Sequence, residues 1–77
     1  MNEARRDRLR VAVKKLSDVH SIVETVCDKE EDCLDNYPEN LQNSDRFERI
    51  ETAVDSLNDA LEKLEEATEC IQTAISQ

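Results

Sequence analysis

The chain has 77 residues, a mass of 8.9 kDa and a formal net charge of −9. This length allows one small domain, residues 1–77. The sequence has no Gly or Trp, and only one Pro, one Tyr and one Phe, so the residues that build tight turns and strands are scarce. These numbers exclude glycine-rich nucleotide-binding loops and predict an all-α protein.

Two features bear on the cellular compartment. No apolar run reaches the roughly 18 to 20 residues that cross a bilayer, and residues 1–15 lack the apolar stretch of a signal peptide. Cys27, Cys33 and Cys70 are an odd number of cysteines, and the first two cannot bridge each other on a helix. We therefore expect buried or half-buried free thiols, a cytoplasmic location and no membrane partner.

The first half of the chain predicts a helix over about residues 3–35. Its apolar residues follow the 3,4 spacing of one helix face: Leu9, Ala12, Leu16, Val19, Val23 and Val26, continuing through Glu30 and Cys33 to Tyr37, with Val13, His20, Cys27 and Leu34 widening the face. Pro38 ends the helix because proline cannot donate within it. Residues 36–43 then form a loop.

The second half predicts a helix over about residues 44–76, capped by Asn43 or Ser44. Apolar residues repeat there in heptads, and an alanine precedes the seam position in four successive repeats. We call these residues the heptad seam: Phe47, Ile50, Ala53, Val54, Leu57, Ala60, Leu61, Leu64, Ala67, Ile71 and Ala74. The small alanines predict close approach of another helix.

A short loop brings two such helices together antiparallel, so we predict a coiled-coil-like two-helix hairpin. Residues 1–20 carry six basic and three acidic residues, and we expect them to lie against four acidic residues of the second helix: Glu62, Glu65, Glu66 and Glu69. Val11 and Ile22 lie off the main apolar stripe. They predict a second contact face and a homodimer that forms a four-helix bundle.

The sequence offers little for catalysis. His20 is the only histidine and has no recognisable nucleophile beside it, so we expect no enzyme. His20 and Cys27 share a face, but they lack zinc-site spacing, and the acidic residues 28–32 lack the glycine of a calcium loop. We therefore expect no metal and no cofactor. The basic cluster at residues 5–10 suits phosphate, yet the net charge disfavours direct nucleic-acid binding.

The outer face of the second helix carries seven carboxylates without an intervening Lys or Arg, over about 36 Å at helical rise. We call them the acidic row: Asp45, Glu48, Asp55, Asp59, Glu62, Glu66 and Glu69. One interpretation is that the row only keeps a small bundle in solution. The other is that it imitates a nucleic-acid backbone, because single-sign fields steer partners.

Residues 35–71 resemble a group of small acidic helical proteins of bacteriophages, prophages and other mobile elements of Gram-positive bacteria. The resemblance lies in the segment DNYPENLQNSDRFERIETAVDSLNDALEKLEEATECI. In that group, a Tyr/Asn-Pro-Glu-x-Leu-Gln-x-Ser loop precedes a repetitive Ala-Leu-Glu-Glu helix. The resemblance implies a phage or mobile-element origin, and it assigns no functional residue. This chain departs from the pattern in its three cysteines and arginine-rich start.

These observations favour a non-enzymatic binding protein that inhibits a bacterial defence or nucleic-acid-binding protein through the acidic row. We expect its partner to present a basic surface and its location to be the host cytoplasm. The alternative is a structural or adaptor protein that oligomerises, or pairs with a partner helix, through the alanine-flanked heptad seam.

Overall fold

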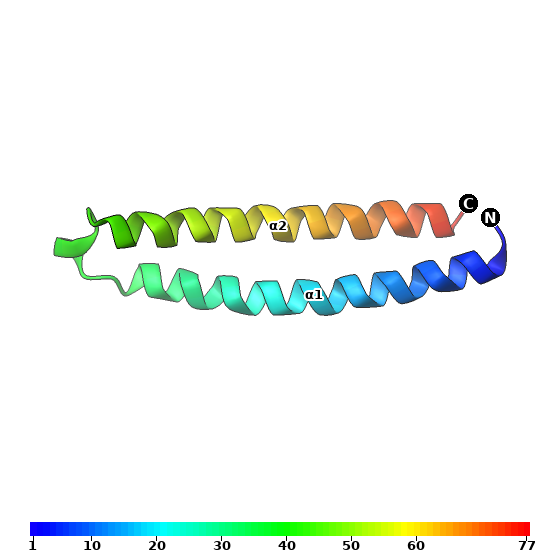
Figure 1. Cartoon of the computed structure of the whole chain (residues 1–77), viewed down its shortest axis with the longest axis horizontal. Helices are drawn as coiled ribbons and strands as arrows, with labels where there is room; N and C mark the ends of the chain where they lie inside the picture. Colours follow the sequence, from blue (N-terminus) through cyan, green and yellow to red (C-terminus); the bar gives the residue numbers. More distant parts are fainter.

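The computed structural model describes residues 1–77 as two long α-helices joined by a short loop (Figure 1). Helix α1 spans Glu3–Asp35, the 3-10 turn η1 spans Glu39–Leu41 and helix α2 spans Asp45–Ile75. The helices run antiparallel, so both termini lie at one end of a rod that measures 59 × 15 × 14 Å. The expected all-α hairpin is confirmed.

Side-chain caps explain where both helices begin. Asn2 accepts a hydrogen bond of 2.9 Å from the backbone N–H of Arg5. Ser44, one of the two expected caps, accepts one of 3.2 Å from the backbone N–H of Phe47. Each cap satisfies one of the N–H groups that a helix leaves without a partner in its first turn.

The loop is held by proline and by the two aromatic rings of the chain. Pro38 has φ −58° and ψ 134°, an extended conformation that stops α1, and the turn η1 follows it. The ring of Tyr37 meets the ring of Phe47 edge-on, with centroids 5.3 Å apart. Aromatic pairs prefer this edge-on geometry. The contact joins the end of α1 to the first turn of α2.

The packing between the helices is thin. Only Cys27 and Val54 are buried, at 1% and 7% exposed. The remaining residues of the heptad seam are half-buried, except Ala67, which is exposed. Two helices alone therefore leave most of their apolar surface open to solvent.

The seam of α1 is displaced from its expected centre. Val19 and Val26 were expected there and are 43% and 46% exposed, and Cys33 is also exposed. His20 and Cys27, each one residue further along the chain, occupy the seam instead. The expectation weighed apolar character alone, whereas polar partners on α2 hold these two residues in place.

Candidate functional site

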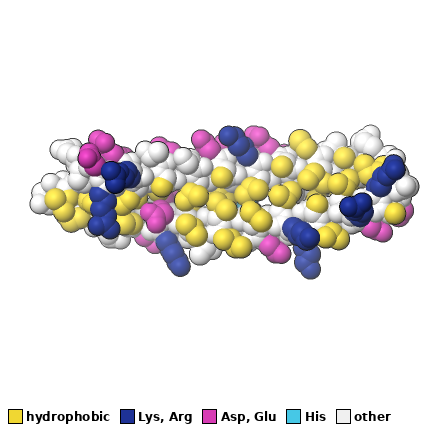
Figure 2. All heavy atoms as spheres, viewed as in Figure 1, with side chains coloured by type: hydrophobic (Ala, Val, Ile, Leu, Met, Phe, Trp, Pro, Cys, Tyr) yellow, Lys and Arg dark blue, Asp and Glu magenta, His cyan; other side chains and the backbone are white.

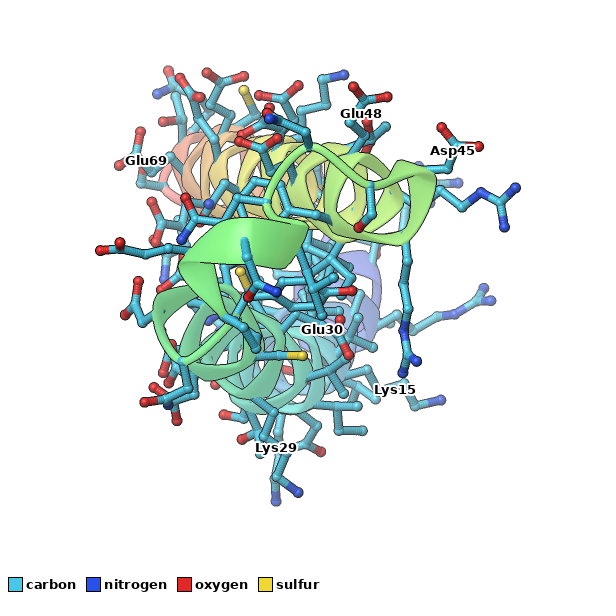
Figure 3. All side chains as sticks on the ribbon, turned by 90° about the vertical axis from the view of Figure 1, so that its left-hand side faces the viewer. Lys15, Lys29, Glu30, Asp45, Glu48 and Glu69 are labelled. Atoms are coloured by element: carbon cyan, nitrogen blue, oxygen red, sulfur yellow. The ribbon has the colours of Figure 1, made fainter.

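The acidic row lies on the outer face of α2, and all seven of its residues are exposed. In the view along the rod, its ends Asp45 and Glu69 point to opposite sides and Glu48 points outward between them (Figure 3). The row therefore crosses the outer face of the helix obliquely. Asp45 and Glu48 also occupy the first turn of α2, where the helix dipole favours negative charge.

None of the seven carboxylates has an internal ion-pair partner. The ion pairs of the chain use four other acidic residues: Glu3, Asp7, Glu24 and Glu65. Like charges four residues apart, such as Asp55 and Asp59, disfavour a helix by a few tenths of a kcal/mol. The row is thus a mildly unfavourable arrangement in which no carboxylate forms an ion pair within the chain.

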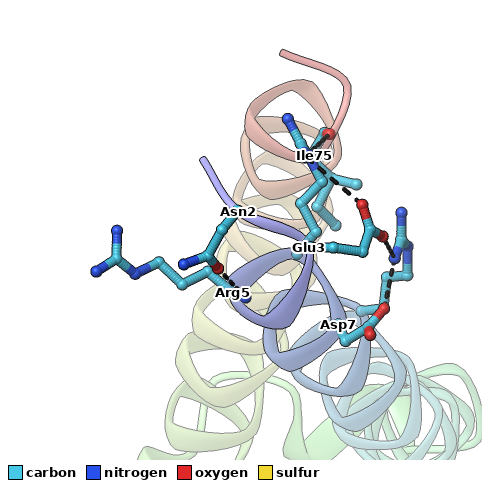
Figure 4. A network of polar contacts seen from close by, with 7 residues as sticks. Asn2, Glu3, Arg5, Asp7 and Ile75 are labelled. Atoms are coloured by element: carbon cyan, nitrogen blue, oxygen red, sulfur yellow. Dashed lines mark hydrogen bonds and ion pairs between the residues drawn. The ribbon is translucent and has the colours of Figure 1, made fainter.

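The arginine-rich start does not supply these ion pairs, contrary to the expected pairing with Glu62, Glu65, Glu66 and Glu69. Arg10 instead binds Glu3 and Asp7 of its own helix, at 2.7 and 2.6 Å (Figure 4). Carboxylates three and seven residues away on the same face of α1 are closer than any on α2. The positive end of α1 is therefore partly neutralised within α1.

One arginine joins the two helices at the open end of the hairpin. Arg6 Nε donates a 3.1 Å hydrogen bond to the carbonyl of Ile75 in the last turn of α2, where a helix lacks internal donors. Glu3 lies beside both Arg6 and Arg10, and its hydrogen bond from Arg10 lowers its pKa below the usual value. This network orders the chain ends and provides no reactive group.

His20 makes the one ion pair that crosses between the helices. Its Nε2 lies 3.0 Å from Glu65 Oε1, and its Nδ1 lies 4.0 Å from Glu24 Oε2. A half-buried imidazole between two carboxylates, beside Ser17 and Ser21, lines an open hollow of the surface. Sequence reasoning missed Glu65 as its partner. The signal was available in the antiparallel register, which sets these two residues level with each other.

Cys27 forms a second polar contact across the seam. Its thiol lies 3.6 Å from both Glu31 Oε1 and Asn58 Oδ1, and Asn58 Nδ2 donates to Glu31 Oε1 at 3.3 Å. Burial, and then the hydrogen bond to Glu31, raise the pKa of the Cys27 thiol. A protonated thiol is a poor nucleophile, so Cys27 serves packing. Asn58 was not foreseen from the sequence either.

All three cysteines are free thiols. Cys33 and Cys70 are exposed, which corrects the expectation that every thiol is at least half-buried. No three His, Cys, Asp or Glu side chains come together as metal ligands. Neither helix combines the length and the apolar character that crossing a membrane requires.

The molecule has two different long sides. Most carboxylates lie on one side in the view along the rod, and Lys15 and Asp45 point to the other (Figure 3). That other side shows hydrophobic side chains gathered along the line between the helices, with Lys, Arg, Asp and Glu near its margins (Figure 2). No protein-family model, curated protein or solved structure matches the chain.

Proposed function

We propose that the chain is a non-enzymatic protein-binding module whose acidic row docks onto the basic, nucleic-acid-binding surface of another protein. The observation that supports this most is that all seven carboxylates are exposed and none has an ion-pair partner within the chain. Charges of one sign accelerate encounter with an oppositely charged surface. The resemblance to phage and mobile-element proteins favours a bacterial partner, such as a defence nuclease, that the chain inhibits.

The dimensions of the row suit this role. Seven carboxylates over about 36 Å give one negative charge per roughly 5 Å, the same scale as the 3.4 Å rise per phosphate along one DNA strand. Because the row crosses α2 obliquely (Figure 3), its charges follow a slanted path, as a strand of a duplex does. A groove lined with Lys and Arg can therefore meet several of them at once.

The test compares two triple variants that have the same net charge. One reverses the middle of the row with Asp55→Lys, Asp59→Lys and Glu62→Lys. The control reverses three exposed carboxylates outside it with Asp28→Lys, Asp32→Lys and Glu39→Lys. Each protein is immobilised and challenged with the heparin-binding fraction of a bacterial lysate, and retained proteins are identified by mass spectrometry.

We expect the wild type and the control to retain the same nucleic-acid-binding protein and the row variant to lose it. Added duplex DNA should displace that protein, and its affinity should fall steeply with salt. Equal retention by all three chains, or binding that is constant from low to high salt, contradicts the proposal. In that case the charge of the row serves only to keep the protein in solution.

A second candidate is favoured by the apolar side of the hairpin, where Ile22 is 65% exposed. It is a structural or adaptor role in which the alanine-flanked seam pairs with another helix. Ala60→Leu should abolish such assembly by blocking close approach, whereas changes in the acidic row should have little effect on it.

A further inference from the structure

The side of the hairpin opposite the carboxylates carries an apolar face built from both helices. In antiparallel helices, the residue just before each seam position lies on the same side of both. On α1 this flank holds Val19 and Val26, followed at its edge by Val11 and Ile22. On α2 it holds four alanines, one per heptad: Ala53, Ala60, Ala67 and Ala74. We call these eight residues the apolar face.

Four large aliphatic side chains of this face are exposed to solvent. Val11, Val19, Ile22 and Val26 are 55%, 43%, 65% and 46% exposed. A contiguous apolar patch of this kind marks an interaction surface. The opposite side, by contrast, is bridged by the polar contacts of His20 with Glu65 and of Cys27 with Asn58.

The exposed area agrees with a missing partner of standard size. The chain exposes 5879 Å², whereas a compact monomer of its mass exposes about 4,800 Å². The excess of about 1,100 Å² is close to the roughly 800 Å² that each partner contributes to a standard interface. One further protein surface on the apolar face therefore suffices to give the chain an ordinary core.

The register across the hairpin indicates what that surface is. His20 lies level with Glu65, and Cys27 lies level with Asn58, so Val19 lies within one residue of the level of Ala67, and Val26 within one residue of the level of Ala60. At each of these two levels, which are one heptad apart, a valine of α1 thus lies beside an alanine of α2. A second copy, turned about an axis along the rod, lays its α1 over α2 at the same levels, large against small.

The other twofold arrangement, with its axis across the rod, fits less well. It lays α1 on α1 and α2 on α2, which opposes valine to valine and alanine to alanine. It also brings Lys63 of one copy beside Lys63 of the other near the middle of the rod. Both the spacing of the helices and the charges therefore disfavour it.

The charges at the margins complement the lengthwise arrangement. Lys15 points to the side of the apolar face, Lys29 points away from α2 on the outer side of α1 (Figure 3), and neither has an ion pair in the chain. In the lengthwise dimer each comes within about one helical turn of a carboxylate at the α2 edge of the other copy. The pairs are Lys15 with Glu66 and Lys29 with Asp59, while Asp55, Glu62 and Glu69 stay outside the contact.

We propose that the apolar face binds a second copy of this chain, giving a four-helix bundle whose twofold axis runs along the rod, with both loops at one end. Each α1 then contacts α2 of the other copy, so all neighbouring helices are antiparallel. The dimer does not depend on the proposed function, because most of the acidic row remains outside its interface.

The first test measures mass by light scattering at micromolar concentration. The wild type should have the mass of two chains, and Val26→Asp should weaken association by roughly 100-fold because it places a charge in the apolar contact. Thr25→Asp makes the same charge change on an exposed residue of the neighbouring position and should leave the dimer intact. A wild-type mass of one chain overturns the proposal.

The second test measures the orientation. A spin label is attached at Asn40→Cys in the loop, in a chain with Cys33→Ser and Cys70→Ser that keeps the buried Cys27. The proposed dimer places two labels on the order of 20 to 30 Å apart, a few interhelical distances. Labels separated by about the 59 Å length of the rod overturn the lengthwise axis.

Two further outcomes separate this proposal from others. A monomer that cosediments with vesicles of equimolar phosphatidylglycerol and phosphatidylcholine would show that the apolar face, with its marginal lysines, binds lipid instead of a second copy. Val26→Asp is also carried through the lysate experiment. If it retains the DNA-displaceable protein, then the acidic row functions without the dimer, and each proposal stands or fails by itself.

Discussion

The two long sides of the hairpin differ in how the helices meet. On one side, polar groups cross the seam: His20 with Glu65, and Cys27 and Glu31 with Asn58. On the other side, valines lie beside alanines and no hydrogen bond or ion pair crosses. Polar contacts specify the pairing of the helices, since each group has one suitable partner, whereas the apolar side leaves surface that any complementary helix pair can cover.

The charges follow the same division. Carboxylates such as Glu69 crowd the polar side, whereas Lys15, which has no ion pair within the chain, points to the apolar side together with Asp45 (Figure 3). A hairpin of this kind can bind a copy of itself on one side and a basic partner on the other. Substitutions that add charge to the apolar side, or remove a polar contact from the polar side, test this division.

The largest effect is expected from making the apolar side acidic, with Val19→Asp and Val26→Asp together. In a dimer, a tenfold rise in concentration is worth about 1.4 kcal/mol, so the Tm of the wild type should rise by several degrees. The double variant should melt at a lower temperature that is independent of concentration. Calorimetry over a hundredfold concentration range measures both. A wild-type Tm that does not vary with concentration contradicts the expectation.

A smaller effect is expected from removing the polar contact on the other side with Asn58→Ala. The change leaves the Cys27 thiol and Glu31 without their partner across the seam, at a cost of about 1 kcal/mol in the free energy of unfolding. Ser56→Ala is the matched control, since Ser56 is exposed on the same helix and its side chain makes no hydrogen bond. Urea unfolding measures both variants. Equal losses would mean that the contact contributes nothing.

Much of the fold could be predicted because its signals are local. The ends of the helices are set by the side-chain caps Asn2 and Ser44 and by the missing N–H of Pro38. Helix α2 carries one apolar stripe with heptad spacing and no second stripe that could be mistaken for it. The observed bounds of both helices lie within one residue of the expected ones.

The face of α1 could not be predicted in the same way because it carries two stripes with the same spacing. Val19 and Val26 continue one stripe, and His20 and Cys27 continue the other. Only their partners on α2 decide between the stripes. The apolar character of Val19 and Val26 favoured their stripe as the seam, and the structure places both valines outside it.

For the acidic row, the position could be predicted from the sequence but the absence of ion pairs could not. Its exposure follows from heptad position alone, and its place in the fold matches that expectation. The absence of ion pairs along the row could not be predicted from heptad position, because it depends on whether Arg10 pairs with carboxylates of α1 or of α2. That arginine binds Glu3 and Asp7, which are already near it before the hairpin closes.

The smallest effect concerns the buried thiol and appears only at alkaline pH. The pKa of Cys27 is raised above its ordinary value of 9.0, so above that pH the unfolded chain loses a proton that the folded chain keeps. The stabilising contribution of the thiol is therefore complete below about pH 9 and is lost as the pH rises through the folded pKa. The stability of the wild type should thus fall toward that of Cys27→Ser as the pH rises above about 9.

The control for this prediction is the pair of exposed thiols. Cys33 and Cys70 are exposed in the folded chain, so the double variant Cys33→Ser, Cys70→Ser keeps the buried thiol and should show the same alkaline loss of stability as the wild type. The same difference can be read chemically, since a thiol-specific disulfide reagent should modify these two cysteines fast and Cys27 only as the hairpin opens. A constant gap between the wild type and Cys27→Ser from neutral to alkaline pH, or three equally fast thiols, would show that the polar side is as open as the apolar one.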